Sequence, residues 1–193
     1  MAILNLNLEL YSGSTNFNSV SEYKMIYDNY YKPLVSFLYA NPDFSFSFYF
    51  SGPEFEYIKK KNPEFLEILK KLVDRKQVEL IGGGFYNPVF PLLFPMDRSG
   101  QVDLLSTAIR KATGKRPRGV CLCASAWDPS LVTSFETCGM EYVELDSSLI
   151  SKDKNLFLPI VMADRGKSIK ILPVHNDFIP NENEEPSDLL LRI

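Results

Sequence analysis

The sequence has 193 residues but only one histidine, His175. A hydrolytic metal site usually takes several histidine and carboxylate ligands, so we expect no metal and no cofactor. Cysteine is also scarce, and Cys121, Cys123 and Cys138 make an odd number that fits no disulfide framework. Free thiols are typical of a reducing compartment, and we therefore expect a cytoplasmic protein.

An excess of positive charge is missing too, because the net charge is −3. A broad basic surface for nucleic acid is therefore not expected. No apolar run approaches the roughly 20 residues of a membrane-spanning helix, and the first residues lack the pattern of a secretory signal. Neither nucleic acid nor a membrane is predicted as a partner. The length is most simply that of one domain, residues 1–193.

Hydrophobic periodicity predicts strands and helices in alternation. The predicted strands are residues 3–10, 44–50, 78–81, 119–123, 142–145 and 169–173. Four helices are predicted. The first begins at the capping pair Ser19 and Glu22 and is interrupted at Pro33, and the second begins at Asn62 and Pro63. The third covers 104–112 and ends at Gly114, and the fourth is short and is capped by Asp128 and Pro129. Residues 181–193 are acidic and then apolar, which predicts a loop entering a helix.

This alternation predicts parallel strands joined by right-handed helical crossovers. An α/β barrel is the leading architecture, and an open doubly wound sheet is the alternative. In a parallel barrel the functional residues gather at the carboxyl ends of the strands.

Residues 78–101 are the most informative stretch of the chain. A short strand is followed by Gly82, Gly83 and Gly84, and such a run indicates a sharp turn or a close approach to the backbone. The loop that follows is rich in aromatic residues and proline, which predicts that it packs over a pocket or covers an edge of the core.

This stretch resembles the second sequence region of glycoside hydrolase family 57, the α-amylase and 4-α-glucanotransferase type. The matching residues are Glu79, Gly82, Gly83, Gly84, Phe85, Tyr86, Pro88, Asp97, Arg98 and Gln101. Asn87 stands where the family pattern has glutamate.

Residues 121–129 resemble the family's nucleophile motif, which reads about Trp-Leu-x-Glu-Arg-x-Trp-Glu-Pro. The matching residues are Leu122, Trp127 and Pro129, followed downstream by Gly139, Tyr142, Val143 and Asp146. Ala124 occupies the nucleophile position and Ser125 that of the neighbouring arginine. A methyl group cannot form a glycosyl-enzyme bond.

The first strand departs from the family pattern as well. Residues 9–13 replace its His-x-His-Gln-Pro motif, although Asn16 and Phe17 keep the tail that follows. The family's acid/base aspartate comes from a later strand and has no counterpart that can be assigned here. The resemblance covers residues 1–175 and implies an incomplete or distorted parallel (β/α)7-type barrel of the glycoside hydrolase and deacetylase kind. The chain then corresponds to a single barrel-like domain or to the N-terminal part of a longer family barrel.

These departures predict a catalytically degenerate homologue that binds an α-glucan, another oligosaccharide or a partner protein. No catalytic residue is transferred from the family. The predicted sugar-binding residues are Phe85, Tyr86, Asn87, Trp127 and Asp146. Core or barrel-mouth packing is the competing interpretation for each of the aromatic residues.

Two enzymatic alternatives remain. An active α-glucan hydrolase or transferase would need a relocated carboxylate, and Glu9, Asp128 and Asp146 are the only candidates considered. A metal-dependent polysaccharide deacetylase would use a related barrel, but one histidine is too few for its usual ligands.

A barrel that stops after about six strands would leave two unpaired strand edges. A homodimer or a partner chain is therefore predicted to cover the open barrel, with the segment 181–193 folding back as an alternative.

Overall fold

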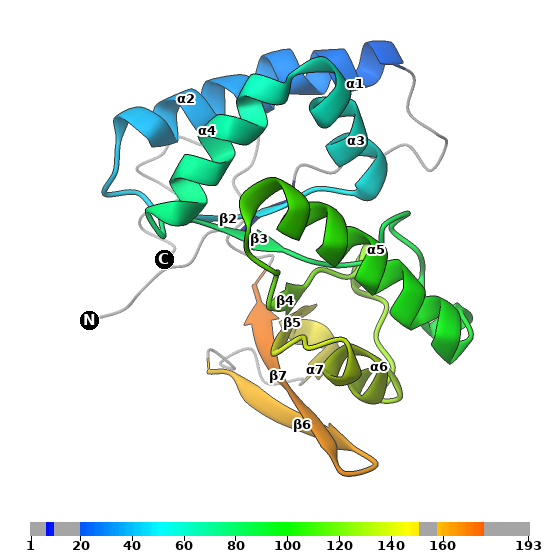
Figure 1. Ribbon diagram of the computed structural model, residues 1–193. Coiled ribbons are helices and arrows are strands. Elements are labelled where there is room, and N and C mark those ends of the chain that lie inside the picture. The colour runs from blue at the N-terminus through cyan, green and yellow to red at the C-terminus, as the bar shows by residue number, and fades with distance from the viewer. Residues whose placement is uncertain (1–6, 10–19, 151–157, 176–193) are drawn as a thin grey trace.

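The computed structural model describes residues 7–9, 20–150 and 158–175 (Figure 1). Its strands form one sheet in the order β1-β2-β3 and another in the order β4-β5-β7-β6. The strands are β1 (Asn7–Glu9), β2 (Phe46–Tyr49), β3 (Val78–Ile81), β4 (Gly119–Val120), β5 (Tyr142–Asp146), β6 (Ile160–Asp164) and β7 (Lys167–Val174).

The two sheets meet where β3 ends and β4 begins. The N–H of Gly82 donates to the carbonyl of Gly119 at 2.8 Å, and the N–H of Cys121 donates to the carbonyl of Gly82 at 2.9 Å. In the series β1, β2, β3, β4, β5 and β7, each strand pairs in parallel with the next. The predicted α/β architecture with parallel strands is therefore confirmed, and the carboxyl ends of these strands lie along one edge.

The N-terminal helices lie together over the first sheet (Figure 1). They are α1 (Val20–Ile26), α2 (Lys32–Ala40), α3 (Gly52–Lys61) and α4 (Pro63–Asp74). A π-helical segment, Tyr27–Tyr31, separates α1 from α2. This is the interruption that Pro33 predicts, because proline has no N–H to donate to the carbonyl four residues earlier. Ser19 of the predicted capping pair lies outside the described residues.

Helix α3 is absent from the predicted elements, because the Gly52-Pro53 pair just after the predicted strand 44–50 indicates the end of a strand rather than the start of a helix. Ser51 is its N-cap, and Glu54 completes a capping box by accepting the Ser51 N–H at 2.9 Å. The other carboxylate oxygen of Glu54 accepts the hydroxyl of Tyr31 at 3.1 Å. Burial raises the pKa of Glu54, and the hydrogen bonds from Ser51 and Tyr31 oppose that shift. This contact fastens the start of α3 to the π-helical segment.

The C-terminal helices are α5 (Pro95–Thr113), α6 (Leu131–Thr137) and α7 (Ser147–Ile150), with single 3₁₀ turns at Phe90–Leu92 and Cys123–Ser125. Gly114 follows α5 at φ 80°, as predicted for a left-handed helix end. The N-cap of α6 is Ser130 rather than Asp128, and Asp128 instead accepts the Ser130 N–H at 2.9 Å.

Two strand predictions differ from the structure. β4 has two residues rather than five, because the chain leaves the ladder after Val120 and turns at Cys123–Ser125. β7 pairs with the parallel β5 as expected, but its other neighbour is β6, which is antiparallel and was not predicted. This hairpin extends from the end of the molecule opposite α1 and α2 (Figure 1).

Apolar side chains form two cores. The first lies among β2, β3 and the helices α2, α3 and α4, and includes Phe48, Phe55 and Leu69; the second lies among β4, β5, β7 and α6, and includes Phe135 and Val143. Among the described residues, no helix is long and apolar enough to cross a membrane. The predicted loop and helix at 181–193 lie outside the described residues.

Candidate functional site

The carboxyl ends of β2, β3, β4 and β5 carry most of the residues singled out from the sequence. Because these strands are parallel neighbours, their ends share one edge, where parallel barrels place their sites. The residues concerned are Tyr49 after β2, Gly82–Asn87 after β3, the turn 123–128 after β4, and Asp146 at the end of β5.

The backbone after β3 is so closely surrounded that side chains have no room there, which explains the run of glycines. A Cβ atom on Gly83 would lie 2.8 Å from Cε2 of Tyr49 and 2.9 Å from the carbonyl oxygen of Cys121. A Cβ atom on Gly84 would lie 2.1 Å from Cδ of Pro88. This is the close approach to the backbone that three consecutive glycines predict.

Asn87 sits on a tight turn beside Tyr49. Its φ is 49°, a left-handed conformation that asparagine tolerates better than glutamate does, and its N–H donates to the Gly84 carbonyl at 3.0 Å. The hydroxyl of Tyr49 lies 3.3 Å from both Oδ1 of Asn87 and the carbonyl oxygen of Gly84. The departure from the family's glutamate therefore places a neutral amide, held by a tyrosine hydroxyl, at the strand edge.

Arg98 joins the loop after β3 to the segment after β4. Its side chain is 8% exposed, and its Nε donates to the carbonyls of Phe90 and Leu93 at 3.1 and 2.9 Å. Its two Nη atoms donate to the carbonyl of Pro91 at 3.1 Å and to the hydroxyl of Ser130 at 3.0 Å. One guanidinium therefore fixes the aromatic loop against the start of α6.

The turn after β4 carries Ala124 at φ 51° and Ser125 at φ 50°. Two successive left-handed residues, neither of them glycine or asparagine, are costly, and such strain is concentrated at functional sites. The Ala124 side chain is exposed, so a methyl group reaches solvent at this turn. It supplies neither a nucleophile nor a proton donor.

Asp128 is tied to its own turn. Hydrogen bonds from the hydroxyl and the backbone N–H of Ser130 hold the pKa of Asp128 below its ordinary value, and the charge of Arg98 adds to the shift. A glycosidase general acid needs the opposite shift, because it must hold a proton near neutral pH.

Asp146 and Glu9, the other two acids considered, lie on separate strands. Oδ1 of Asp146 accepts the N–H of Ser148 at 2.8 Å in the first turn of α7. Glu9 ends β1, where it is in register with Tyr49 of β2. His175, which follows β7, has its Nδ1 atom 3.3 Å from the hydroxyl of Ser147. Among the described residues, no three His, Cys, Asp or Glu side chains are grouped closely enough to hold a metal ion.

The predicted aromatic residues differ in exposure. Phe85 is 7% exposed and belongs to the first core, and its backbone carbonyl accepts the Gly52 N–H at 2.7 Å. Tyr86 is 61% exposed, and its ring packs edge-on against Phe85 with the centroids 4.9 Å apart. Trp127 is partly buried against the second core, and its Nε1 is buried without a hydrogen-bond partner among the described residues.

Residues 4–189 match the sequence profile of glycosyl hydrolase family 57. The chain belongs to this family. It is 34% identical over 163 residues to alpha-amylase 1 of Dictyoglomus thermophilum, covering 82% of this chain and 24% of that protein. It is 35% identical over 153 residues to the 4-alpha-glucanotransferase of Thermococcus litoralis, covering 77% of this chain and 23% of that protein. The chain thus spans about a quarter of the length of these relatives.

Solved structures agree with this family 57 assignment. The crystal structure of the Thermococcus litoralis 4-alpha-glucanotransferase superposes with a TM-score of 0.82 at 30% identity, covering 90% of this chain and 29% of that one. The described elements form part of the family's (β/α)7 barrel, as predicted. A putative polysaccharide deacetylase from Mycobacterium smegmatis, at 11% identity and a TM-score of 0.60, shares the fold alone.

Three residues of the site received no role from the sequence. The predicted strand 44–50 gives Tyr49 no role beyond the strand, although its position at the last residue of β2 places it at the site edge. Arg98 and Gln101 matched the family pattern without an assigned function. Oε1 of Gln101 accepts the N–H of Tyr86 at 2.9 Å, so α5 holds the loop through both side chains.

Proposed function

We propose that this chain is a family 57 homologue without hydrolase or transferase activity, and that it binds an α-glucan. Ala124 at the family's nucleophile position is the observation that carries the proposal. The names of the relatives, alpha-amylase and 4-alpha-glucanotransferase, identify α-glucan as the ligand class to consider.

The chemistry of a retaining glycosidase supports the first part of the proposal. Such an enzyme needs two carboxyl groups about 5–5.5 Å apart, one as nucleophile and one as a proton donor. Asp128 and Asp146 each accept a backbone N–H two residues ahead, which is the contact of a turn-forming aspartate. An exposed methyl group at Ala124 leaves the turn after β4 without a nucleophile.

The polar and aromatic groups at the strand edge support the second part. Tyr86 offers an exposed ring, and sugar rings stack on such faces. The Asn87 amide beside the Tyr49 hydroxyl can exchange hydrogen bonds with sugar hydroxyls. Asp146 and Trp127 are both partly exposed, and Trp127 offers ring surface only, because its Nε1 is buried. The buried ring of Phe85 packs edge-on against Tyr86 and supports it.

Trp127 is the only tryptophan in the sequence, so its fluorescence reports on this edge alone. Titration with maltoheptaose is expected to change its emission saturably. Tyr86→Ala is expected to weaken binding by roughly threefold to tenfold, because a stacked aromatic ring contributes on the order of 1 kcal/mol. Tyr30→Ala is the control, since Tyr30 is 54% exposed on the π-helical segment and should not affect affinity. No spectral change with maltoheptaose would reject glucan binding.

We also propose that a second copy or a partner chain covers the open sheet. Among the described residues, β1 pairs only with β2 and β6 only with β7. Val161 on β6 is 70% exposed, and an apolar edge of this kind is a liability unless it is covered. Sedimentation velocity at micromolar concentration is expected to show a homodimer that Val161→Lys weakens. A monomer at all concentrations would count against it.

A cytoplasmic location is the last part of the proposal. Cys121, Cys123 and Cys138 are not joined by disulfide bonds, and two of them are buried. Cysteines without disulfide bonds suit a reducing compartment. Fractionation of cells expressing the tagged protein tests this, and recovery outside the cytoplasm would refute it.

A further inference from the structure

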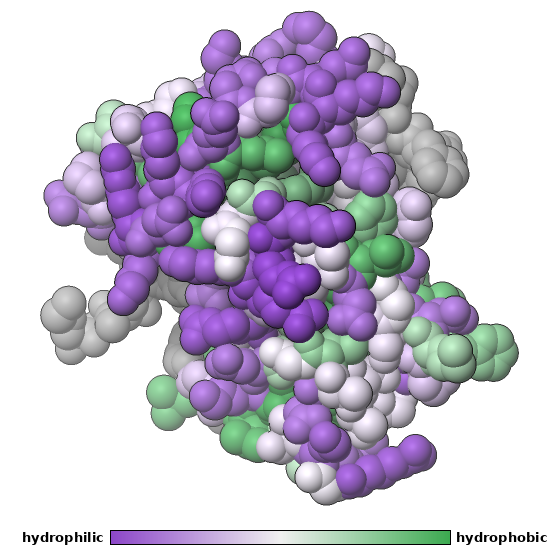
Figure 2. Space-filling view, in the orientation of Figure 1, coloured by the Kyte–Doolittle hydropathy of each residue, from purple (hydrophilic) through white to green (hydrophobic). Residues whose placement is uncertain are grey.

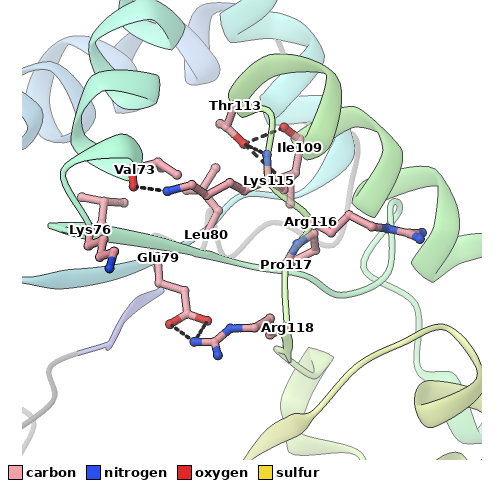
Figure 3. Close-up of a pocket in the computed structure, with 11 residues that line it drawn as sticks. Val73, Lys76, Glu79, Leu80, Ile109, Thr113, Lys115, Arg116, Pro117 and Arg118 are labelled. Carbon is pink, nitrogen blue, oxygen red and sulfur yellow. Dashed lines mark hydrogen bonds and ion pairs between the residues drawn. The ribbon is translucent and has the colours of Figure 1, made fainter.

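A pocket of about 480 Å³ lies at the opposite end of the sheet from the strand edge described above. Its walls come from three places: the end of α4 with the turn that follows it, β3, and the connection from α5 to β4 (Figure 3). Barrels of this kind place their catalytic residues at the other end of the strands. The pocket is therefore separate from the site proposed to bind glucan.

Basic side chains predominate around this pocket. Lys76, Lys115, Arg116 and Arg118 line it against a single carboxylate, Glu79. Hydrophilic residues gather on the same face near the start of β4 (Figure 2). Arg116 turns away to pair with Asp103 at 3.5 Å, which leaves three cations on the side where Glu79 lies (Figure 3).

One backbone carbonyl binds both lysines, Lys115 through its side chain and Lys76 through its main chain. The carbonyl of Val73 accepts both the backbone N–H of Lys76 at 3.1 Å and the Nζ of Lys115 at 2.8 Å. Lys76 itself has φ 61°, and the next residue, Gln77, anchors the turn by donating to the carbonyls of Leu38 and Asn41. Lys76 thus belongs to an anchored turn, and the Nζ of Lys115 is bound to the same turn.

The charges of the two lysines are only partly neutralised. Within the described parts of the chain, the ammonium group of Lys76 has no hydrogen bond or ion pair. Lys115 has Asp74 at 4.0 Å and uses one of its three donors on Val73, so two donors remain.

The carboxylate of Glu79 has partners other than the lysines. Arg118 is paired with Glu79 at 3.4 Å and Glu141 at 3.7 Å, and the hydroxyl of Tyr142 donates to Glu79 at 3.1 Å. Glu79 is therefore held away from the two lysines by partners of its own.

We propose that this pocket binds the phosphate group of a small phosphate monoester, with Lys76 and Lys115 as its principal contacts and Arg118 at the rim. Ammonium groups that keep free donors form charge-assisted hydrogen bonds with phosphate oxygens. The volume lies in the range of small-ligand sites. The remaining walls, Val73, Leu80, Ile109 and Pro117, are apolar and can hold the organic part of the ester.

Isothermal titration of the whole chain with glucose 1-phosphate and with AMP tests this proposal. At least one ester is expected to bind measurably, while glucose and adenosine are not, and the affinity should fall as salt is raised. The ester that binds identifies the kind of organic group that the pocket accepts. The absence of binding by both esters at about 5 mM, a concentration that detects millimolar affinity, would overturn the proposal.

The double variant Lys76→Gln, Lys115→Gln is expected to weaken ester binding by on the order of tenfold. Lys60→Gln, Lys61→Gln is the matched control, because it changes the net charge equally at two exposed positions of α3 that do not line the pocket. Equal affinity in the two double variants would contradict the assignment. The test is independent of glucan binding, which Trp127 fluorescence follows at the other end of the strands.

Discussion

Gly83→Ala is expected to lower the free energy of unfolding by roughly 3 kcal/mol, because it overpacks a crowded site. The new methyl group would lie 2.9 Å from the backbone oxygen of Cys121 and 2.8 Å from the ring of Tyr49. Neither neighbour can move easily, since Tyr49 is 6% exposed and Cys121 bonds through its N–H to Gly82. Urea unfolding followed by circular dichroism measures the change.

Gly100→Ala provides the matched control for this prediction. A Cβ atom on Gly100 meets nothing within 4 Å, and the residue lies inside α5. Alanine favours a helix interior over glycine, so stability should rise by about 0.5–1 kcal/mol. A Gly83→Ala variant as stable as the parent protein would show that the edge between β3 and β4 is not closely packed.

Arg98→Ala is expected to destabilise the protein by about 3 kcal/mol and to loosen the loop after β3. The variant removes a buried guanidinium and leaves the carbonyls of Pro91 and Leu93 without this donor, while the Phe90 carbonyl keeps only the Leu93 N–H. Arg98→Lys keeps the charge but cannot make the same fork of bonds, so it should recover only part of the loss. Urea unfolding gives the stability, and amide exchange of residues 86–94 gives the loop order.

Arg110→Ala is the control for this second prediction. Arg110 lies on the same helix but is exposed, and its loss should change stability by no more than about 0.5 kcal/mol. If Arg98→Ala matched Arg110→Ala in both measurements, Arg98 would not be the residue that holds the aromatic loop.

The parallel α/β arrangement was predictable because each strand and helix carries a local signal. The alternation at 44–50 correctly predicts β2, yet the burial of β2 does not alternate, since Ser47, Phe48 and Tyr49 are all buried. Parallel strands are covered on both faces, so a polar residue such as Ser47 is enclosed as well. The sequence pattern therefore indicated the strand but not its surroundings.

Helix α3 and strand β6, which are absent from the predicted elements, do carry local signals in the sequence. Ser51 and Glu54 have the spacing of a capping box at the start of α3, which was hidden by the adjacent Gly-Pro pair. The hairpin of β6 and β7 turns at Arg165 and Gly166, which both have positive φ. A glycine in a two-residue turn of this kind is a hairpin signal.

The candidate site was only partly predictable. The glycine run and the position of Ala124 could be identified from the resemblance, whereas the left-handed backbone of Ala124 and Ser125 could not, because neither residue type favours it. The contacts of Arg98 with Ser130 and of Tyr49 with Asn87 join residues 32 and 38 positions apart, and no local pattern reports them.

Turnover of maltoheptaose by the purified protein is the most direct test of the central claim. We expect none above background, and we expect Ala124→Glu not to restore it, because Ser125 supplies no guanidinium beside the new carboxylate. The loss of a nucleophile removes a factor on the order of 10⁴ or more in rate. Glu9→Gln, Asp128→Asn and Asp146→Asn should therefore leave any background unchanged. Turnover that one of these three substitutions abolishes would show that a relocated carboxylate is at work and that the chain is an active enzyme.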